Sequence, residues 1–467
     1  MGHRIFNSNN IRKTIRYCRK NGWKHTFFAA MERTKRETGE SYVYEPLSEF
    51  ALREQIDKRM EFTTKFSILV PAYETRPDYL RELMESVLNQ TYGELELILA
   101  DASRGGQVEQ VVKEYQDDRI RYVRLQTNDG ISENTNRALA LATGDYVGLL
   151  DHDDLLTPDA LFEMAKAIRE QEKKGVALQL LYSDEDKCDE TAERFYEPHR
   201  KQELNIDLIM TNNYICHFMV IKRELIQQLG LRKDYDGAQD YDLVLRALQQ
   251  MLGTAENEGA ETPGMILKKL PVYHINRILY HWRCHSASTA ENPDSKRYAY
   301  EANKRAVEDF LRNRGIEAAV VHSAHLGFYR IQYPANIFES RQDLGIVGGK
   351  LLNRRNKITG GIYKADGTVE FADLPAGFSG YMNRAALQQD AYAVDVRCMK
   401  LAPAVEAVWE QVFGLPPIKR EDGWLDWKSC VNEEADYVRL SIQFCEAVRR
   451  AGYGVLWDPQ ETVVLKR

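Results

Sequence analysis

Four consecutive residues, Asp151 to Asp154, carry the strongest chemical signal in the sequence. They follow the apolar run 146–150, which predicts a buried strand. Carboxylates crowded at a strand end repel each other, and a divalent cation removes the repulsion because hard cations prefer oxygen ligands. Mg²⁺ or Mn²⁺ in such a site shares its other positions with water and substrate phosphates. Alternatively, Asp154 caps the next helix, but capping requires neither Asp151 nor Asp153.

Two further groups of residues have side chains suited to catalysis or ligand binding. Asp240 precedes a helical apolar pattern at 243–248. It could act as a base toward a hydroxyl group, or simply favour the helix dipole from the first turn. If residues 278–289 form a strand, His281, Arg283 and His285 share one face. A histidine there could bind a metal ion, although a lone histidine is more often a hydrogen-bonded core residue.

These residues are positioned by an alternation of short strands and helices. Strands are predicted at 66–70, 95–100, 120–125, 146–150 and 176–183, with helices at 79–89, 108–115, 134–142 and 155–169. The order predicts an α/β fold with a doubly wound, mostly parallel sheet. Ligands bind beyond the carboxyl ends of such strands, here 71–74, 101–104, 126–130 and 151–154.

The chain divides into three regions: a basic helical segment at 1–64, the α/β domain at 65–333 and a smaller α/β module at 334–467. In the first region aromatic residues, including Trp23, Phe27 and Phe28, alternate with many lysines and arginines. Such a helix could lie on an anionic membrane surface, or it could pack its apolar side on the main domain.

Composition limits the classes of protein that fit. The 467 residues are 43% hydrophobic and 28% charged, which is ordinary for a globular protein, and the net charge of −7 argues against nucleic-acid binding. The seven cysteines form no C-x-x-C pair, which argues against a disulfide framework. Without an apolar run of about 20 residues or a signal peptide, we expect a cytoplasmic protein, with peripheral contact at the inner membrane face as one interpretation of the basic segment.

Four motifs together resemble family 2 glycosyltransferases with the GT-A fold, particularly rhamnosyltransferase-like enzymes of bacterial surface-polysaccharide synthesis. The motifs are VPAYE (70–74), LILADAS (97–103), the segment 128–154 that ends in DHDD, and GAQDYDLVLRAL (237–248). Each motif is weak alone, but the four in this order and spacing are specific. The resemblance covers about residues 65 to 330.

The resemblance implies a role for each matching position. The nucleotide-sugar site would contain Pro71, Tyr73, Glu74, Asp101, Asn128, Asn134, Asp151 and Arg283. Asp153 would be the direct ligand of Mn²⁺ or Mg²⁺, completed by His285 and assisted by Asp151. Asp240 would be the catalytic base, although the Glu that usually precedes this Asp is replaced by Gln239. Asp242 is interpreted as a structural neighbour.

The function implied is inverting transfer of a hexosyl or rhamnosyl group from a nucleotide-diphosphate sugar to a hydroxyl of a glycan or polyprenyl-linked acceptor. One alternative is a catalytically silent carbohydrate-binding or scaffold protein, which Gln239 would suit. Another is a nucleotidyltransferase, but residues 70–79 lack the glycine-rich basic loop expected of one.

Two segments remain outside the four motifs. The acidic run 183–187 could be a second metal site, although a strand end near the acceptor cleft is the simpler interpretation. Residues 345–369 and 434–459 resemble the later half of a second glycosyltransferase domain, with Asp436 near the base position. No second P-x-Y strand or D-x-D motif accompanies them, so we predict a noncatalytic module for acceptor binding or assembly.

Overall fold

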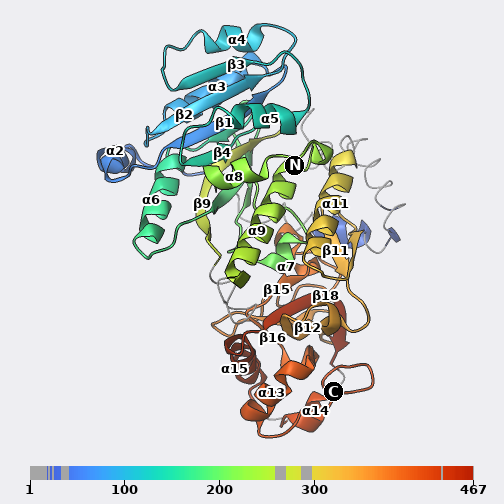
Figure 1. Cartoon of the computed structure of the whole chain (residues 1–467). Coiled ribbons are helices and arrows are strands. Elements are labelled where there is room, and N and C mark those ends of the chain that lie inside the picture. The colour runs from blue at the N-terminus through green and yellow to red at the C-terminus, as the bar shows by residue number, and fades with distance from the viewer. Residues whose placement is uncertain are drawn as a thin grey trace.

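The computed structural model describes residues 18, 22–23, 26–32, 42–257, 270–285, 297–432 and 435–465. A large α/β unit is followed by a smaller unit with its own sheet (Figure 1). None of the helices in these ranges is long and apolar enough to cross a bilayer.

The larger unit is organised around a nine-stranded sheet in the order β3-β2-β1-β4-β8-β6-β9-β5, with β7 paired to β6. Its strands are β1 (Phe66–Ala72), β2 (Leu95–Asp101), β3 (Ile120–Arg124), β4 (Tyr146–Leu149), β5 (Leu155–Leu156), β6 (Leu180–Cys188), β7 (Phe195–His199), β8 (Met219–Lys222) and β9 (Val272–Arg283). The half β3-β2-β1-β4 is wholly parallel. The carboxyl ends of these four strands therefore meet at one edge, as the sequence predicts.

Helices cover both faces of this sheet because alternate strand residues are apolar on both sides. On one face Ile68 and Val70 pack with α3 (Pro77–Leu88), α4 (Gln107–Val112) and α6 (Ala160–Glu172). On the other, Leu69 packs with α5 (Ile131–Leu139), α8 (Arg223–Leu229), α9 (Gln239–Asn257) and α11 (Arg297–Asn313). This double coverage confirms the predicted doubly wound α/β fold.

The second half of the sheet is mixed. Strand β8 runs antiparallel to both β4 and β6, while β6 and β9 are parallel to each other. The pairing of β6 with β9 shifts register after Ser183, where Asn276 and Arg277 are extra residues on β9. Such a bulge redirects side chains locally, and it moves those of Asn276 and Arg277 out of the regular alternation.

Two predicted elements are placed differently by the structure. The helix predicted from residue 155 begins at Ala160, because Leu155 and Leu156 first pair with β9. The strand predicted at 176–183 starts at Leu180 and continues to Cys188. The acidic residues 184–186 can stay inside this strand because histidines and a lysine lie against them.

The smaller unit contains the five-stranded sheet β13-β12-β18-β15, with β17 paired to β12. Its strands are β12 (Leu344–Leu352), β13 (Ile358–Gly360), β15 (Gln389–Asp390), β17 (Met399–Leu401) and β18 (Gly454–Val464). The helices α13 (Glu406–Phe413) and α15 (Tyr437–Arg450) pack on it through a core that includes Trp409, Phe444 and Trp457. The module is α/β, as predicted.

A buried cation joins the two units. Arg341 is 5% exposed and bonds to Asp207 of the larger unit at 2.6 Å and to Asp343 at 2.7 Å. Asn205 and Asp390 also exchange two hydrogen bonds across the junction, of 2.9 and 3.0 Å. Burial alone would lower the pKa of Arg341. The negative charges of Asp207 and Asp343 outweigh that effect and raise it.

Replacing Arg341 with Met should destabilise the protein by about 3–5 kcal/mol, because Asp207 would stay buried without its cation. Urea unfolding of the full chain measures the change. The control is Arg450→Ala, since Arg450 is 69% exposed and its ion pair with Glu446 spans 3.7 Å. We expect a change within about 0.5 kcal/mol for that control. Equal effects of the two variants would contradict the role of Arg341.

Candidate functional site

The ends of β1 and β2 form one side of the predicted site. Ala72 pairs with Asp101, so Pro71, Tyr73 and Glu74 lie beside the end of β2. The backbone N–H of Glu74 donates to Ser103 Oγ at 2.8 Å, and its carboxylate accepts from the backbone N–H of Arg104, also at 2.8 Å. Tyr73 is 40% exposed, which leaves an aromatic side chain available at this rim.

Asp101 is fully buried and hydrogen-bonded within the protein. One oxygen accepts from the backbone N–H of Ser103 at 2.8 Å. The other accepts from Tyr122 Oη at 2.8 Å and from Arg124 at 2.7 Å. Asp101 therefore orders the side chains at the β2 and β3 ends, and its predicted bond to a nucleotide base stays a prediction.

Asn128 and Asn134 contact each other at the start of α5. Asn134 Nδ2 donates to Asn128 Oδ1 at 2.9 Å. The amide oxygen of Asn134 is buried and has no hydrogen-bond partner among the described residues. Such an acceptor is costly to leave unpaired, and a ligand donor could satisfy it.

Gly130, at the start of α5, allows the loop before Asp240 to pack closely against this helix end. Its φ is +102°, and a Cβ there would lie 2.0 Å from a carboxylate oxygen of Asp236. The other oxygen of Asp236 accepts from the backbone N–H of Ser132 at 3.1 Å. Only glycine allows this approach, so the loops 128–130 and 236–240 are held side by side.

The structure brings together two of the three predicted metal ligands. His285 Nε2 lies 2.8 Å from Asp153 Oδ2, although the two residues are 132 positions apart. Desolvation raises the pKa of Asp151, and the negative charges of Asp153 and Asp240 raise it further. Asp151 itself faces His217, at 3.8 Å. No described set of three or more His, Cys, Asp or Glu side chains is spaced to hold a metal ion.

Asp154 is not the helix cap that the sequence allowed. It is buried, and its carboxylate accepts from Tyr280 Oη and from the backbone N–H of Arg283 at 2.7 Å. Burial, and then the charges of Asp153 and Asp151, raise the pKa of Asp154 well above its usual value. Asp154 thus fixes the DHDD turn to β9, which aligns Asp153 with His285.

Arg283 also ties this turn to its surroundings. Its fully buried side chain donates to the carbonyl oxygens of Asp153 at 2.7 Å and Glu190 at 2.6 Å, and pairs with Glu82 at 2.5 Å. Each of the three guanidinium nitrogens thus has a partner within the protein. Arg283 therefore positions the Asp153 backbone, and its predicted approach to a diphosphate finds no support in these contacts.

Asp240 lies in the first turn of α9, and its carboxylate accepts from Asn213 Nδ2 at 3.0 Å. It is close enough to the DHDD turn for its charge to affect the pKa of Asp151. Asp242, by contrast, is buried between Arg232 and Arg246, so the structural role predicted for it is confirmed. Of these two acids, Asp240 is the one whose charge acts on Asp151.

Sequence analysis found the acid Glu185 in the run 183–187 but missed the basic residues that surround it behind the DHDD turn. Glu185 accepts from the backbone N–H of His217 at 2.5 Å and lies 3.3 Å from its ring, 3.2 Å from His199 and 3.7 Å from Lys201. Burial alone would lower the pKa of His217, but Glu185 and Asp151 raise it to about 9. A protonated imidazole therefore faces Asp151 at neutral pH.

The remaining acids of β6 are paired in the same way. Asp184 lies 2.8 Å from His274, and Asp186 lies 2.5 Å from His281 and accepts from Tyr42 Oη at 2.7 Å. The acidic run is visible in the sequence. Which histidines pair with Asp184 and Asp186 depends on strand register, which the sequence does not reveal. These pairings explain the acidic run without a second metal ion.

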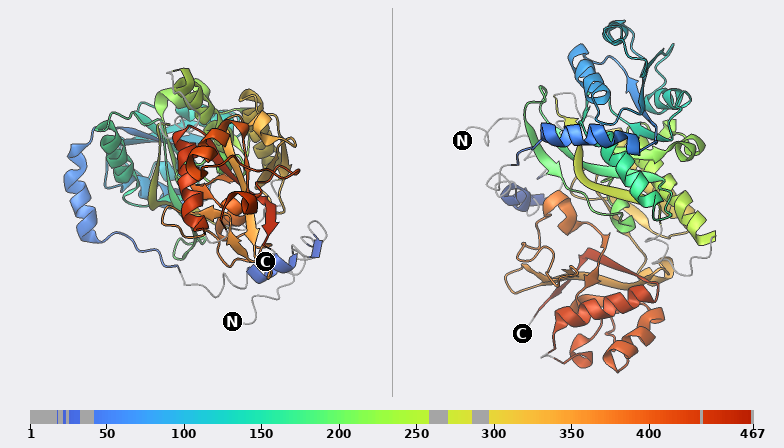
Figure 2. Two further views of the ribbon diagram at one scale, coloured as in Figure 1. Left: turned by 90° about the horizontal axis from the view of Figure 1, so that it is seen from below. Right: turned by 90° about the vertical axis from the view of Figure 1, so that its left-hand side faces the viewer.

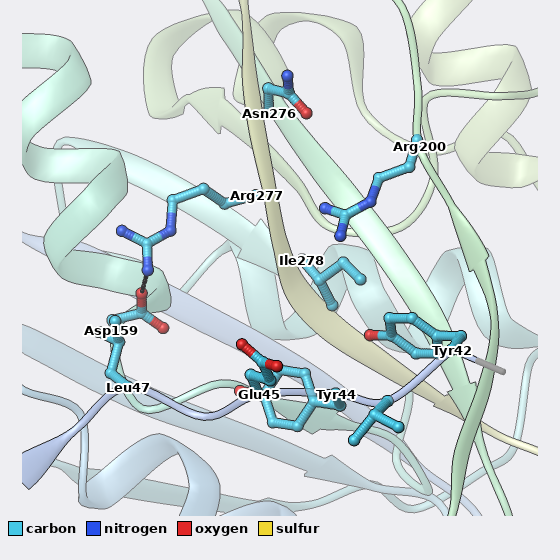
Figure 3. A pocket seen from close by; sticks show the side chains of 10 residues that line it. Tyr42, Tyr44, Glu45, Leu47, Asp159, Arg200, Asn276, Arg277 and Ile278 are labelled. Carbon is cyan, nitrogen blue, oxygen red and sulfur yellow. Dashed lines mark ion pairs between the residues drawn. The ribbon is translucent and has the colours of Figure 1, made fainter. Parts of the chain in front are cut away.

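A polar cavity of about 240 Å³ lies apart from the DHDD turn, between residues 42–47 and the β9 bulge (Figure 3). Arg277 lines it while paired to Asp159 at 2.9 Å and to Glu163 at 2.8 Å. Arg200 lies on the opposite side, near Tyr42 (Figure 3). None of the predicted site residues lines this cavity.

Glu185→Gln should destabilise the protein by about 3–5 kcal/mol at neutral pH, because buried Lys201 loses its counter-charge. Burial opposes ionisation of Glu185, but Lys201, His199 and His217 outweigh it and hold its pKa well below the usual value. A lowered pKa contributes stability that is present above the unfolded pKa of about 4.3 and lost as pH falls below it. The difference in Tm between wild type and variant should thus be constant from neutral pH to about pH 5 and narrow below.

The control for that experiment is Glu197→Gln. Glu197 also pairs with a lysine, Lys187, but its side chain is 68% exposed. Its replacement should cost less than about 1 kcal/mol and show little dependence on pH. A pH-independent gap for the Glu185 variant would contradict the charge pairing.

Comparison with known proteins now defines the class. Residues 67–230 match the family model described as Glycosyl transferase family 2. Over 294 residues the chain is 32% identical to the O-antigen biosynthesis protein RfbC of Myxococcus xanthus, covering 62% of this chain and 21% of that protein. An uncharacterized protein of Sinorhizobium fredii, y4gI, is 35% identical over 285 residues, which are 60% of this chain and 29% of that protein.

Residues 67–230 therefore form a domain of the glycosyl transferase family 2 type, and the larger unit that contains them has the GT-A-type α/β fold. The aligned region spans less than a third of the two relatives above. Among solved structures, S. aureus TarS in complex with UDP-GlcNAc is similar at 19% identity and a TM-score of 0.39, covering 54% of this chain and 68% of that one.

Proposed function

We propose that this domain transfers a sugar, with inversion, from a nucleotide-diphosphate donor to a hydroxyl of a glycan or polyprenyl-linked acceptor. The observation that carries the proposal is the contact of Asp153 with His285 at the meeting ends of β4 and β9, with Asp240 close by. The family match supports a glycosyltransferase at this site. A donor would lie across the ends of β1, β2 and β4.

The residues at this edge suit Mn²⁺ or Mg²⁺. Asp153 and His285 offer an oxygen and a nitrogen at one point, and Asp151 adds a carboxylate whose ionisation its acidic neighbours oppose. These metals commonly take only one or two protein carboxylates and fill their other positions with water and phosphate. A bound ion would neutralise the developing charge of the leaving diphosphate.

In the proposed mechanism Asp240 removes the proton of the acceptor hydroxyl as its oxygen attacks the anomeric carbon. Asn213, at 3.0 Å, would hold the Asp240 carboxylate in place. Attack opposite the leaving diphosphate inverts the configuration, so one carboxylate suffices and no covalent sugar–enzyme bond is needed. The hydrogen bonds of Asp154 and Arg283 keep the DHDD turn rigid meanwhile.

The acceptor class is inferred from relatives. The name of the Myxococcus relative refers to O-antigen biosynthesis, and we infer a related role in cell-surface polysaccharide synthesis, with a hexosyl or rhamnosyl donor. The smaller C-terminal module would then bind acceptor or aid assembly. Asp436, which resembles a base in the sequence, caps α15 by accepting from the Arg439 backbone N–H at 3.0 Å, which fits a noncatalytic module.

Asp240→Asn should lower the rate of sugar transfer by about 10²- to 10⁴-fold, because Asn cannot accept the proton. The affinity for nucleoside diphosphate with Mn²⁺ should stay within a few-fold of wild type. Nucleoside diphosphate release from a panel of nucleotide sugars measures the rate, and calorimetry measures binding. Asp234→Asn, an exposed acid in the preceding turn, is the control and should retain full activity.

An unchanged rate of sugar transfer by the Asp240→Asn variant would show that Asp240 is not the catalytic base. Stabilisation of wild type by a diphosphate without turnover of any donor and acceptor would favour the silent carbohydrate-binding protein. Release of pyrophosphate instead of nucleoside diphosphate would favour a nucleotidyltransferase.

Asp153→Ala should remove most of the stabilisation that nucleoside diphosphate with Mn²⁺ gives the wild-type protein. Ligand stabilisation follows mass action, so a hundredfold weaker affinity at saturating ligand lowers it by about 2.7 kcal/mol. Thermal unfolding with Mn²⁺ and with EDTA checks this, using exposed Asp118→Ala as the control. Equal stabilisation in EDTA and Mn²⁺ would show that donor binding does not depend on metal.

A further inference from the structure

The cavity between residues 42–47 and the β9 bulge lies on the face of the sheet that points away from the DHDD turn. Side chains alternate between the two faces along a strand such as β6. Glu185 contacts His217 on the DHDD side, whereas the next residue, Asp186, accepts from Tyr42 Oη at 2.7 Å. Tyr42 lines the cavity. A ligand in the cavity would therefore be separate from the nucleotide and from the reacting hydroxyl.

The segment 42–47 forms the outer wall of this cavity. It leads along the outer side of the larger unit to α2 (Glu49–Lys58), as Figure 2 shows. The ring of Tyr44 packs edge-on against His281, with centroids 4.6 Å apart, and also contacts Phe195 at 5.0 Å. Together with the hydrogen bond of Tyr42, these contacts hold the segment against the sheet.

The inner wall contains a cation that is already fixed in position. Arg277, in the β9 bulge, pairs with Asp159 at 2.9 Å and with Glu163 at 2.8 Å (Figure 3). Polar groups that are held before a ligand arrives lose little conformational entropy when it binds. This wall is thus preorganised for polar contacts.

Arg200 lies on the opposite side, and its hydrogen-bond donors are available. It lies near Tyr42, across the cavity from Arg277 (Figure 3). Its Nη1 atom is 3.6 Å from Asp184 Oδ2, which is too long for a hydrogen bond. That oxygen is buried and has no hydrogen-bond partner among the described residues. Charge therefore attracts the guanidinium group to this wall without saturating its donors, and a ligand oxygen can accept from it.

The charges that line the cavity cancel. Arg200 and Arg277 are its cations, and Glu45 and Asp159 are its anions. A phosphate group would meet two carboxylates, and a metal ion would meet two guanidinium groups. The cavity therefore favours an uncharged polar ligand.

The lining also combines both kinds of hydrogen-bonding group with apolar surface. Guanidinium groups only donate, carboxylates only accept, and the amide of Asn276 does both. A sugar hydroxyl donates and accepts at once, so neighbouring hydroxyls suit such a mixture. Tyr44, Leu47 and Ile278 add the apolar surface that the C–H face of a sugar ring can contact.

We propose that this cavity binds one uncharged sugar unit of a glycan, as a subsite separate from the catalytic edge. Its volume of about 240 Å³ is below the roughly 300–1,000 Å³ of pockets for drug-sized ligands, which suits a single ring. Naming a glycan as the occupant rests on the proposed function, although sugar binding here requires neither donor nor metal. A second contact of this kind would raise the local concentration of acceptor chain ends at the enzyme.

Saturation-transfer difference NMR of the full chain tests the proposal, with methyl α-D-glucoside and methyl α-L-rhamnoside as probes and without nucleotide or metal. We expect saturation transfer to the ring protons of at least one glycoside. The double variant Arg200→Ala/Asn276→Ala should bind it about tenfold more weakly, because two hydrogen-bonding groups are removed.

The matched control is Arg312→Ala/Asn313→Ala, which removes the same two residue types from the exposed end of α11. It should bind the glycoside like the wild type. Because the side chains replaced in both double variants are exposed, their Tm values should stay unchanged. The Asp153→Ala variant should also bind the glycoside normally, so a failure of the proposed transfer reaction and a failure of this subsite can be distinguished.

Several outcomes would overturn the proposal. They are the absence of saturation transfer to both glycosides, wild-type affinity of the Arg200→Ala/Asn276→Ala variant, and an equal loss of binding in the control or in Asp153→Ala. Displacement of the glycoside by UDP would place the sugar in the donor site. Displacement by inorganic phosphate would indicate an anion site, and either result would also contradict the proposal.

Discussion

Like charges gathered at one edge of the sheet are the constraint on which the larger unit depends. The DHDD turn, the acids of β6 and Asp240 place many carboxylates within reach of each other, and most are shielded from water. The protein compensates with fixed partners: His217 and Lys201 beside Glu185, His274 beside Asp184, His281 beside Asp186, and Tyr280 with the Arg283 backbone on Asp154. Buried acids at such an edge are tolerated because each has a specific counterpart.

Against that background Asp151 and Asp153 differ from their neighbours in exposure, because their side chains are 46% and 22% exposed while Asp154 and the acids of β6 are buried. Asp153 has His285 beside it, and Asp151 faces a histidine at a distance too long for a hydrogen bond. The repulsion between these two carboxylates is therefore of the kind that a bound cation would relieve. The rigid parts of the site, Asp154 and Arg283, serve to hold this less compensated pair in position.

Much of this arrangement could be predicted from the sequence, because periodic apolar runs locate strands and the order of strands locates their shared edge. The family resemblance implied that Asp153 and His285 would share a site although they are more than a hundred residues apart, and the structure brings them to 2.8 Å. Strand register could not be predicted: Glu185 reaches His217 and Lys201 only because β6 extends to Cys188 and its pairing with β9 shifts at Ser183. Nor did the sequence reveal that Arg283 is enclosed by protein acceptors, since an arginine near an acid cluster suggests a ligand contact equally well.

The cation at the junction has a consequence for dissecting the protein. The family match stops at residue 230 and the predicted catalytic region at 333, so a shorter fragment would be a natural choice for biochemical work. Cutting before Arg341 would remove the cation that pairs with Asp207 and the Asn205–Asp390 bonds, and would expose to water the face of the larger unit that the smaller unit covers. Poor yield or aggregation of such a fragment would therefore reflect the loss of the smaller unit. It would give no information about the catalytic activity of the larger one.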